Sequence, residues 1–150
     1  MVKNKQMKIV LMDIFKAVGA PITKDSFIVD DLGIPHKPNN LPKNKMALYM
    51  FIHEDHFIKI GQADKNSNAR FKYQHYNGHA GSGSLCYDII NDPEMKKYNL
   101  SMDNVSDWMK ANLHRIDILI DAELGKLALN IAEASMHYIY NPKYEGKRKR

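Results

Sequence analysis

Two residues on neighbouring strand-like segments could share a catalytic site. The stretch LYMFIHEDHFIKIG, residues 48–61, holds two apolar runs around a charged break, with Tyr49 in the first and Lys59 in the second. A lysine can lower the pKa of a nearby phenol or bound water, provided that both groups lie on one face of the sheet. A three-residue hairpin loop would put them on the same face, and a two-residue loop on opposite faces. The alternative is a lysine that only protects a strand edge.

Basic and aromatic residues alternate in SNARFKYQHY, residues 67–76. Arg70 offers a planar fork of N–H donors for a phosphate, and Lys72, Tyr73, His75 and Tyr76 could contact the same backbone or stack on bases. The alternative is a half-exposed helix that buries its phenylalanine and one or two of its tyrosines. The residue types alone leave both interpretations open.

A polar stripe of Lys126, Asn130, Glu133 and His137 follows helical spacing in a segment that is otherwise apolar. One carboxylate beside a cleft is a sufficient protein ligand for Mg²⁺, because this ion keeps several waters and takes further oxygens from a phosphate. Glu133 is therefore a candidate metal ligand. The alternative is a solvated surface glutamate, as most glutamates are.

Two other segments favour simpler interpretations. HEDH at 53–56 lacks the second histidine, four residues on, that a helical zinc signature requires, and its charges suit an exposed hairpin turn. GHAGSGS at 78–84 has no P-loop lysine and does not directly follow a strand, so we interpret it as a linker. The start of the next helix could still meet a phosphate.

The elements that must position these residues follow from hydrophobic periodicity. Apolar spacing predicts a first helix in residues 5–19, and the proline-rich stretch 20–45 favours a connector over the core. Further along the chain we expect a β-hairpin (46–52 and 56–60), short helices (67–76, 84–92 and 101–113), a third strand (114–121) and a long helix (123–142).

These elements predict an α+β fold. We expect a small three-stranded, mainly antiparallel sheet, made of the hairpin plus a third strand, flanked by helices and with an added N-terminal helix. The expected organisation is an N-terminal helix and connector (1–45) packed on the core, a core domain (46–145) and a basic tail (146–150).

Composition restricts the classes of protein to which the chain could belong. A length of 150 residues suits a single domain, and 44% hydrophobic with 26% charged residues excludes wholesale disorder. No apolar run reaches membrane-spanning length and no signal-peptide cleavage site is evident, so we expect a cytoplasmic protein without a membrane partner. Cys86 is the only cysteine, which excludes an internal disulfide or a cysteine-based zinc site. The net charge of +5 favours an anionic partner, although the terminal GKRKR supplies most of it.

The order of these pieces resembles the GIY-YIG nuclease family. ALY at 47–49 is similar to the family's first triplet on one hairpin strand, and KIG at 59–61 stands in the place of the second triplet. The lysine in this second triplet resembles a restriction-endonuclease branch of the family. Arg70, Glu133 and Asn141 match an arginine on the next helix, a glutamate on the helix after the third strand, and a downstream asparagine. The resemblance covers about residues 46–145.

Two positions depart from the family pattern. Ala47 stands in place of the first glycine, and Gln74 stands four residues after the arginine, where a histidine or tyrosine is expected. The role of that residue must pass to His75, Tyr73 or Tyr76, and we assign it to His75.

The resemblance implies a divalent-metal-dependent endonuclease that hydrolyses nucleic-acid phosphodiester bonds with Mg²⁺ or Mn²⁺. In-line attack needs an activated water, neutralised phosphate charge and a stabilised leaving oxygen. Tyr49 would be the general base or orient the water, and Lys59 would lower the pKa of either. Arg70 would bind the scissile phosphate, His75 would assist proton transfer or bind phosphate, and Glu133 would hold the metal.

The expected substrate is DNA rather than RNA, with Lys72, Tyr73, Tyr76 and Asn141 as further nucleic-acid contacts. A homodimer would supply two active sites for cutting both strands. Two other classes of function remain as alternatives: a non-catalytic nucleic-acid-binding module with the same fold, and a protein-interaction domain whose basic ends are merely solvated. Convergence of the site residues discriminates among them.

Overall fold

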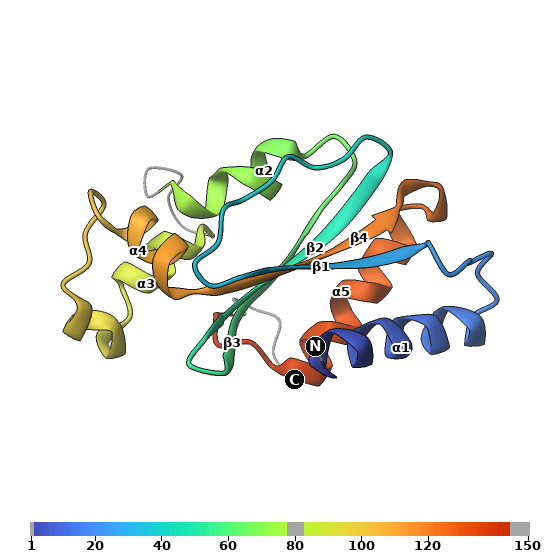
Figure 1. Ribbon diagram of the computed structural model, residues 1–150, viewed down its shortest axis with the longest axis horizontal. Coiled ribbons are helices and arrows are strands. Elements are labelled where there is room, and N and C mark those ends of the chain that lie inside the picture. The colour runs from blue at the N-terminus through green and yellow to red at the C-terminus, as the bar shows by residue number, and fades with distance from the viewer. Residues whose placement is uncertain (1, 78–82, 145–150) are drawn as a thin grey trace.

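The computed structural model describes residues 2–77 and 83–144 and shows a four-stranded antiparallel sheet with helices on both faces (Figure 1). The strand order is β1-β4-β2-β3, so β4 and β2 are central and β1 and β3 are the edges. The strands are β1 (Phe27–Gly33), β2 (Lys45–His53), β3 (His56–Ala63) and β4 (His114–Asp121).

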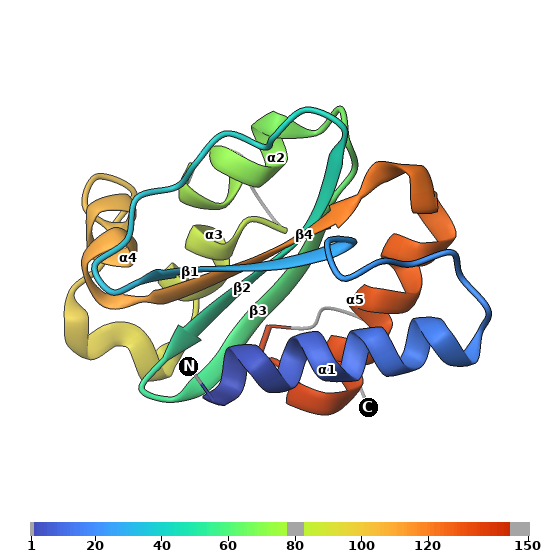
Figure 2. The same ribbon diagram turned by 45° about the vertical axis from the view of Figure 1, so that its right-hand side comes forward.

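Two helices pack on one face of this sheet and three on the other (Figures 1 and 2). The first face carries α1 (Val2–Ala17) and α5 (Lys126–Tyr140), and the second carries α2 (Asn68–Lys72), α3 (Leu85–Ile90) and α4 (Val105–Asn112). Short 3-10 helices are η1 (Gln74–Tyr76), η3 (Pro93–Tyr98) and η4 (Ala122–Leu124). None of the described helices is long and apolar enough to cross a membrane.

The α+β class is confirmed, but the prediction of three strands is wrong because the expected connector contains a fourth. Phe27–Gly33 forms β1, which pairs with β4 from Phe27 opposite Ile120 onwards. The prolines that favoured a connector, Pro21 and Pro35 among them, flank this segment without interrupting it. An edge strand needs a partner on one side only, so a short segment of mixed polarity suffices.

The other predicted strands and the long helix are confirmed. The segment 67–76 forms α2 followed by η1. The long helix ends at Asn141, which adopts the left-handed conformation with φ 45° and is followed by Pro142. An asparagine there costs less than most residues, and the proline prevents another helical turn.

The central strands bury both of their faces. On the α1 and α5 side, the strand residues are apolar: Met46, Leu48, Met50, Ile116, Ile118 and Ile120. On the α2, α3 and α4 side, aromatic and charged residues mix with apolar ones: Ala47, Tyr49, Phe51, Arg115, Asp117 and Leu119. We call these the apolar face and the mixed face. The N-terminal helix belongs to the core of the apolar face, since Met7, Leu11 and Phe15 are buried there.

Candidate active site

The hairpin turn by itself would separate Tyr49 from Lys59. Glu54 and Asp55 form a two-residue turn with φ values of 48° and 67° between the paired residues of β2 and β3. Left-handed residues at both positions match the twist of the two strands. HEDH is therefore the hairpin turn, and its length alone would place the tyrosine and the lysine on opposite faces.

A β-bulge in β3 reverses this outcome. Phe51 pairs with Lys59, whereas the next residue of β2 pairs with Phe57, so Ile58 is an extra residue with no partner on β2. One extra residue shifts every later side chain to the other face. Tyr49 then lies opposite Gly61, and Lys59 shares the mixed face with Tyr49.

Gly61 makes room for the tyrosine ring. A Cβ atom built on Gly61 would lie 2.5 Å from Cε2, Cζ and Oη of Tyr49. The backbone of Gly61 has no positive φ, so the close approach of the ring, and not the backbone conformation, requires a glycine. The glycine of KIG and the tyrosine of ALY are thus in direct contact.

The Tyr49 hydroxyl oxygen accepts hydrogen bonds from two side chains. Arg70 Nε donates to it at 3.1 Å, and His75 Nε2 lies 2.6 Å away. His75 Nδ1 accepts from the backbone N–H of Leu85 at 3.1 Å, so the ring proton belongs on Nε2 and points at the tyrosine. Burial, with the charges of nearby cations, lowers the pKa of His75 to about 3 and keeps it neutral.

Burial raises the pKa of the Tyr49 hydroxyl, Arg70 opposes this shift, and the charge of Glu133 adds to it. The phenol therefore keeps its proton in the free protein. Because the two donors occupy the lone pairs of the oxygen, the O–H proton is left to donate to a third group. The two bonds fix the position of the buried hydroxyl.

Lys59 lies near His75 and pairs with Asp88. Lys59 Nζ is 4.0 Å from Asp88 Oδ2 on α3, and the lysine charge acts on His75. Burial raises the pKa of Asp88, and Lys59 opposes this effect. Sequence reasoning missed Asp88, because a single aspartate on a short helix carries no signal of its own.

Glu133 is buried beside the edge strand β3. Along α5, Asn130 Oδ1 accepts from Gln62 Nε2 at 3.1 Å, and His137 Nε2 lies 2.8 Å from the Ile60 carbonyl. Glu133 lies between these contacts and is only 5% exposed, with its charge acting on Tyr49. The polar stripe of α5 thus covers the sheet edge, and the interpretation of Glu133 as a solvated surface residue is wrong.

Five predicted residues therefore form one cluster. Tyr49, Arg70 and His75 are joined by hydrogen bonds, Lys59 acts on His75 by its charge, and Glu133 acts on Tyr49 in the same way. We call these five residues the Tyr49 centre. They come from β2, β3, α2, η1 and α5, so the centre exists only when the whole fold is assembled.

Three other predicted residues lie away from the Tyr49 centre. Lys72 Nζ donates to Asn40 Oδ1 at 3.0 Å and lies 5.0 Å from the ring centroid of the half-exposed Tyr73. Asn141 caps α5, eight residues beyond Glu133 in the sequence. At about 1.5 Å per residue this is about 12 Å along the helix axis.

Tyr76 is buried, and its hydroxyl is bonded inside the protein. It accepts from Arg115 Nη1 at 2.9 Å and lies 2.7 Å from His36 Nε2. His36 Nδ1 is 2.7 Å from the carbonyl of Leu113, so this nitrogen carries the proton and Nε2 accepts from the tyrosine. The hydroxyl thus ties the connector to β4, and the contact of Tyr76 with nucleic acid stays a prediction.

A buried ion pair supports the mixed face, and sequence reasoning missed it. Arg115 Nε donates to Asp117 Oδ1 at 2.8 Å, and Nη2 donates to the Phe71 carbonyl at 2.8 Å, next to Arg70. Among the described residues, Asp117 Oδ2 is buried without a hydrogen-bond partner. Burial raises the pKa of Asp117 to about 6, against the effect of Arg115. The signal in the sequence was two opposite charges on one face of an otherwise apolar strand.

The donor set of the Tyr49 centre fits a metal ion bound by one protein carboxylate. Within residues 2–77 and 83–144, no group of three or more histidine, cysteine, aspartate or glutamate side chains could hold a metal on its own. Mg²⁺ needs no such group when waters and phosphate oxygens complete its coordination. Glu133 is the carboxylate of the centre that suits this role.

Comparisons with known proteins give no relatives. No protein-family model matches the chain, and no curated protein or solved structure matches it at a significant level. Any functional assignment must come from the residues themselves and from their arrangement.

Proposed function

We propose that the protein is a divalent-metal-dependent endonuclease that hydrolyses phosphodiester bonds in DNA. The observation that carries the proposal is the Tyr49 hydroxyl, which accepts from Arg70 and His75 while the charges of Lys59 and Glu133 act nearby. Phosphodiester hydrolysis requires a positioned water, a cation for the phosphate and an anionic metal ligand. The same residues carry the resemblance to GIY-YIG nucleases.

Arg70 is suited to binding the scissile phosphate. Its Nε donates to Tyr49, and the residue is exposed, so its two terminal amino groups would serve to bind the substrate. A guanidinium that keeps two parallel donors can contact two phosphate oxygens at once. Arg70 would thereby fix the distance between the phosphorus atom and the Tyr49 hydroxyl.

Tyr49 and Lys59 are suited to positioning and activating the nucleophile. Since burial raises the pKa of the Tyr49 hydroxyl, we assign it the role of orienting the attacking oxygen with its O–H. The Lys59 ammonium lowers the pKa of a water beside it, so that hydroxide forms with loss of a proton to solvent. The hydroxide oxygen bonds to phosphorus, and the bond to the leaving oxygen breaks.

Glu133 would hold Mg²⁺ or Mn²⁺, which when bound supplies positive charge for the leaving oxygen. His75 is neutral, with its pKa lowered to about 3 by burial. It therefore acts as a fixed N–H donor that holds the tyrosine in place. We therefore assign His75 the role of positioning Tyr49.

The test is cleavage of supercoiled plasmid DNA, beside a structured RNA, with Mg²⁺, Mn²⁺ or a chelator. Glu133→Gln removes the charge of the metal ligand, and Tyr49→Phe removes only the hydroxyl. Glu123→Gln is the matched control, because Glu123 is an exposed residue of η4. We expect metal-dependent nicking or linearisation that falls about 100-fold in each site variant and is unchanged in the control.

Cleavage that ignores the metal and survives Glu133→Gln would overturn the mechanism. Binding of DNA that weakens steeply with salt, without any product, would instead show the non-catalytic binding module. Preferential cleavage of the RNA would overturn the choice of DNA as substrate.

A further inference from the structure

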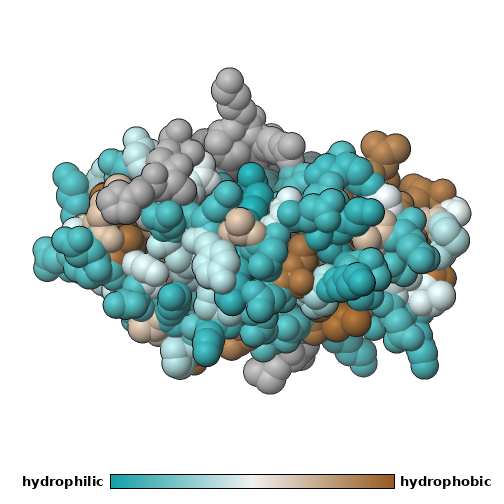
Figure 3. Space-filling model, turned by 90° about the horizontal axis from the view of Figure 1, so that it is seen from above, coloured by the Kyte–Doolittle hydropathy of each residue, from teal (hydrophilic) through white to brown (hydrophobic). Residues whose placement is uncertain are grey.

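A groove lined by three lysines lies next to α2, away from the Tyr49 centre. Its volume is about 470 Å³, and its walls come from the connector, the end of α2 with η1, and α4. Lys37, Lys72 and Lys110 each come from a different one of these elements, and none of the described lining residues is acidic. Figure 3, which shows the molecule from the side of α2 and the connector, shows a surface dominated by hydrophilic residues.

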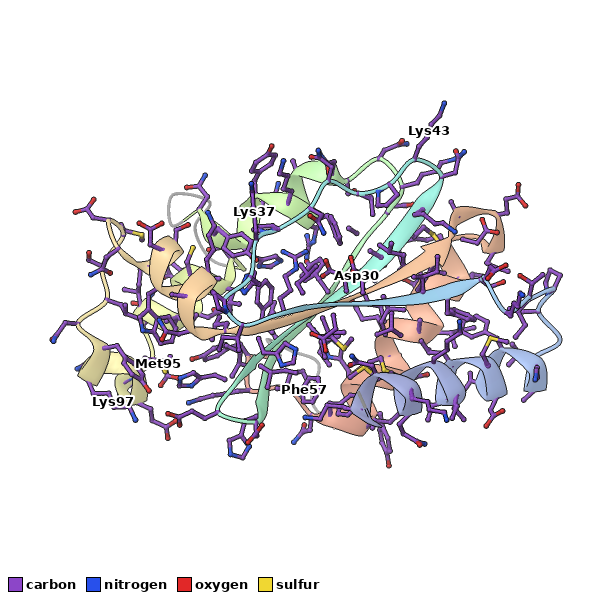
Figure 4. The ribbon with its side chains drawn as sticks, viewed as in Figure 1. Asp30, Lys37, Lys43, Phe57, Met95 and Lys97 are labelled. Atoms are coloured by element: carbon purple, nitrogen blue, oxygen red, sulfur yellow. The ribbon has the colours of Figure 1, made fainter. Side chains whose placement is uncertain are left out.

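Aromatic rings hold two of these lysines at the groove wall. Lys72 Nζ lies 5.0 Å from the ring centroid of Tyr73, and Lys110 Nζ lies 5.5 Å from that of Tyr76. Cation–π contacts of this kind reduce the freedom of the long side chains without neutralising their charge. Lys37 is exposed on the connector (Figure 4). The groove therefore presents positive charges that are partly ordered before any ligand binds.

Helix α2 forms a shared wall between the groove and the Tyr49 centre. Arg70 and Lys72 are two residues apart and so point to opposite sides of the helix, at about 100° per residue. Arg70 contacts Tyr49, whereas Lys72 lines the groove. A helix is about 10 Å across, so the groove and the Tyr49 centre can contact different phosphates of one DNA strand.

We propose that this groove binds the DNA phosphate backbone on one side of the bond that is cut. The proposal takes DNA as the ligand from the proposed function, and adds a second contact site across α2 from the Tyr49 centre. Lysine is a compact point charge that contacts phosphates without reading bases. The groove therefore sets affinity and the position of the strand, and the Tyr49 centre carries out the cleavage.

The binding test compares two triple variants of equal charge. Lys37→Gln, Lys72→Gln and Lys110→Gln together remove the charges of the groove. Lys5→Gln, Lys8→Gln and Lys16→Gln together remove the same charge from α1, on the opposite side of the sheet (Figure 2). Binding to a short duplex is measured by fluorescence anisotropy in chelator over a series of salt concentrations. Thermal unfolding of each variant verifies that the fold is retained.

The affinity of the unmodified protein should fall steeply with salt. In the groove variant we expect a slope of log K against log salt that is less steep by up to about 2.7, at about 0.9 for each phosphate that the protein no longer neutralises. We expect the α1 variant to keep the slope of the unmodified protein. Equal losses in the two variants would mean that only net charge matters, and would overturn the proposal.

A second measurement locates the DNA phosphate that the groove contacts. Neutral methylphosphonates are placed singly at each position near the cut site, and binding is compared with that of the unmodified duplex. We expect a loss of affinity at one position away from the cut, and we expect this loss to disappear in the groove variant. A loss that is the same in the unmodified protein and in the groove variant would contradict the proposal.

Cleavage separates this proposal from the proposed function. If the unmodified protein cuts DNA and the groove variant keeps its KM, the groove proposal fails and the endonuclease assignment stands. If no variant cuts DNA, but the groove variant alone loses affinity, catalysis is wrong and the groove remains a DNA-binding site. A raised KM with an unchanged kcat supports both.

Discussion

The two faces of β2 and β4 are equally well buried but are built from different chemistry. The apolar face packs Leu48 and Ile118 against α1 and α5, and the residues that the central strands place on it are all hydrophobic. The mixed face packs Tyr49 and Phe51 against α2, α3 and α4, and it also contains the fully buried Arg115. The two faces share strands, register and burial, so the difference between them reflects what each face does. The apolar face stabilises the fold, and the mixed face holds the candidate site.

The mixed face tolerates its polar groups because most of them bond to one another. Arg115 donates to Asp117, to the Tyr76 hydroxyl and to the Phe71 carbonyl, and its guanidinium lies 4.9 Å from the ring centroid of Phe71. The Phe71 carbonyl belongs to α2, next to Arg70. A buried charge with several bonds fixes one arrangement of its neighbours, since losing any of these bonds is costly. We infer that this network holds α2 against the sheet.

Among the substitutions on the two faces, Arg115→Met is expected to have the largest effect on stability and on DNA cleavage. It removes a buried charge and leaves Asp117 Oδ1, the Tyr76 hydroxyl and the Phe71 carbonyl without their donor. We expect a loss of about 3–5 kcal/mol in the free energy of unfolding, measured with denaturant. Because α2 is then held less firmly beside Arg70, DNA cleavage below the melting temperature should also fall, by about tenfold or more.

Its matched control lies on the other face. Leu129→Ala, in the core of the apolar face, should cost about 2–5 kcal/mol but leave cleavage by the folded protein within about twofold. The double variant Arg115→Met with Asp117→Leu should be more stable than Arg115→Met alone, because no unpaired charge stays buried. If Leu129→Ala lost as much cleavage as Arg115→Met at equal stability, the functional difference between the faces would be disproved.

A smaller effect is expected from Gly61→Ala, which adds one methyl group to the mixed face. The new Cβ would lie 2.5 Å from the Tyr49 ring, so the ring must move away from Arg70 and His75. Overpacking of this kind costs about 1–3 kcal/mol, and cleavage should fall with the displaced hydroxyl. In a Tyr49→Val background the same substitution should cost almost nothing in denaturant unfolding. An equal cost in both backgrounds would show that the close approach of the ring is not the cause.

The sequence predicted the hairpin, the third strand and the long helix because each follows a simple period in its apolar residues. It does not reveal β1, because the prolines that flank this strand favour an irregular connector over the whole segment from Ala20 to Lys45. A short edge strand has little periodicity of its own, and its pairing with β4 depends on contacts more than 80 residues apart in the chain. Such contacts are invisible to local patterns.

The candidate site, too, depends on long-range contacts that local sequence patterns do not reveal. Tyr49, Lys59, Arg70 and Glu133 could be selected from residue types and order, but the bulge at Ile58 that puts the tyrosine and lysine on one face could not. The backbone N–H groups of Lys143 and Tyr144 donate to the carbonyls of Phe57 and Ile58, so the chain after α5 is bonded to the bulged strand. The register of the hairpin is thus associated with a segment that follows it by more than 80 residues.

The smallest expected effect is a pH dependence of stability that comes from His75 on the mixed face and has no counterpart at Leu129 on the apolar face. Burial lowers the pKa of His75 to about 3, from an ordinary value of 6.5. Because the unfolded chain takes up this proton near pH 6.5 and the folded chain does not, stability is fully present above pH 6.5 and falls as the pH drops toward 3. Between pH 7.5 and 5.5 His75 should account for a loss of about 1.4 kcal/mol in denaturant unfolding.

His75→Gln removes the titrating ring, so its stability should fall less over this range than that of the unmodified protein. The NMR signals of the His75 ring should remain those of a neutral imidazole down to pH 5, since the folded pKa is about 3. A ring that becomes protonated near pH 6.5 would mean that the Tyr49 hydroxyl does not face a neutral donor. Leu129 does not titrate and packs in the hydrophobic cluster of the apolar face, so Leu129→Ala should lower stability by the same amount at both pH values.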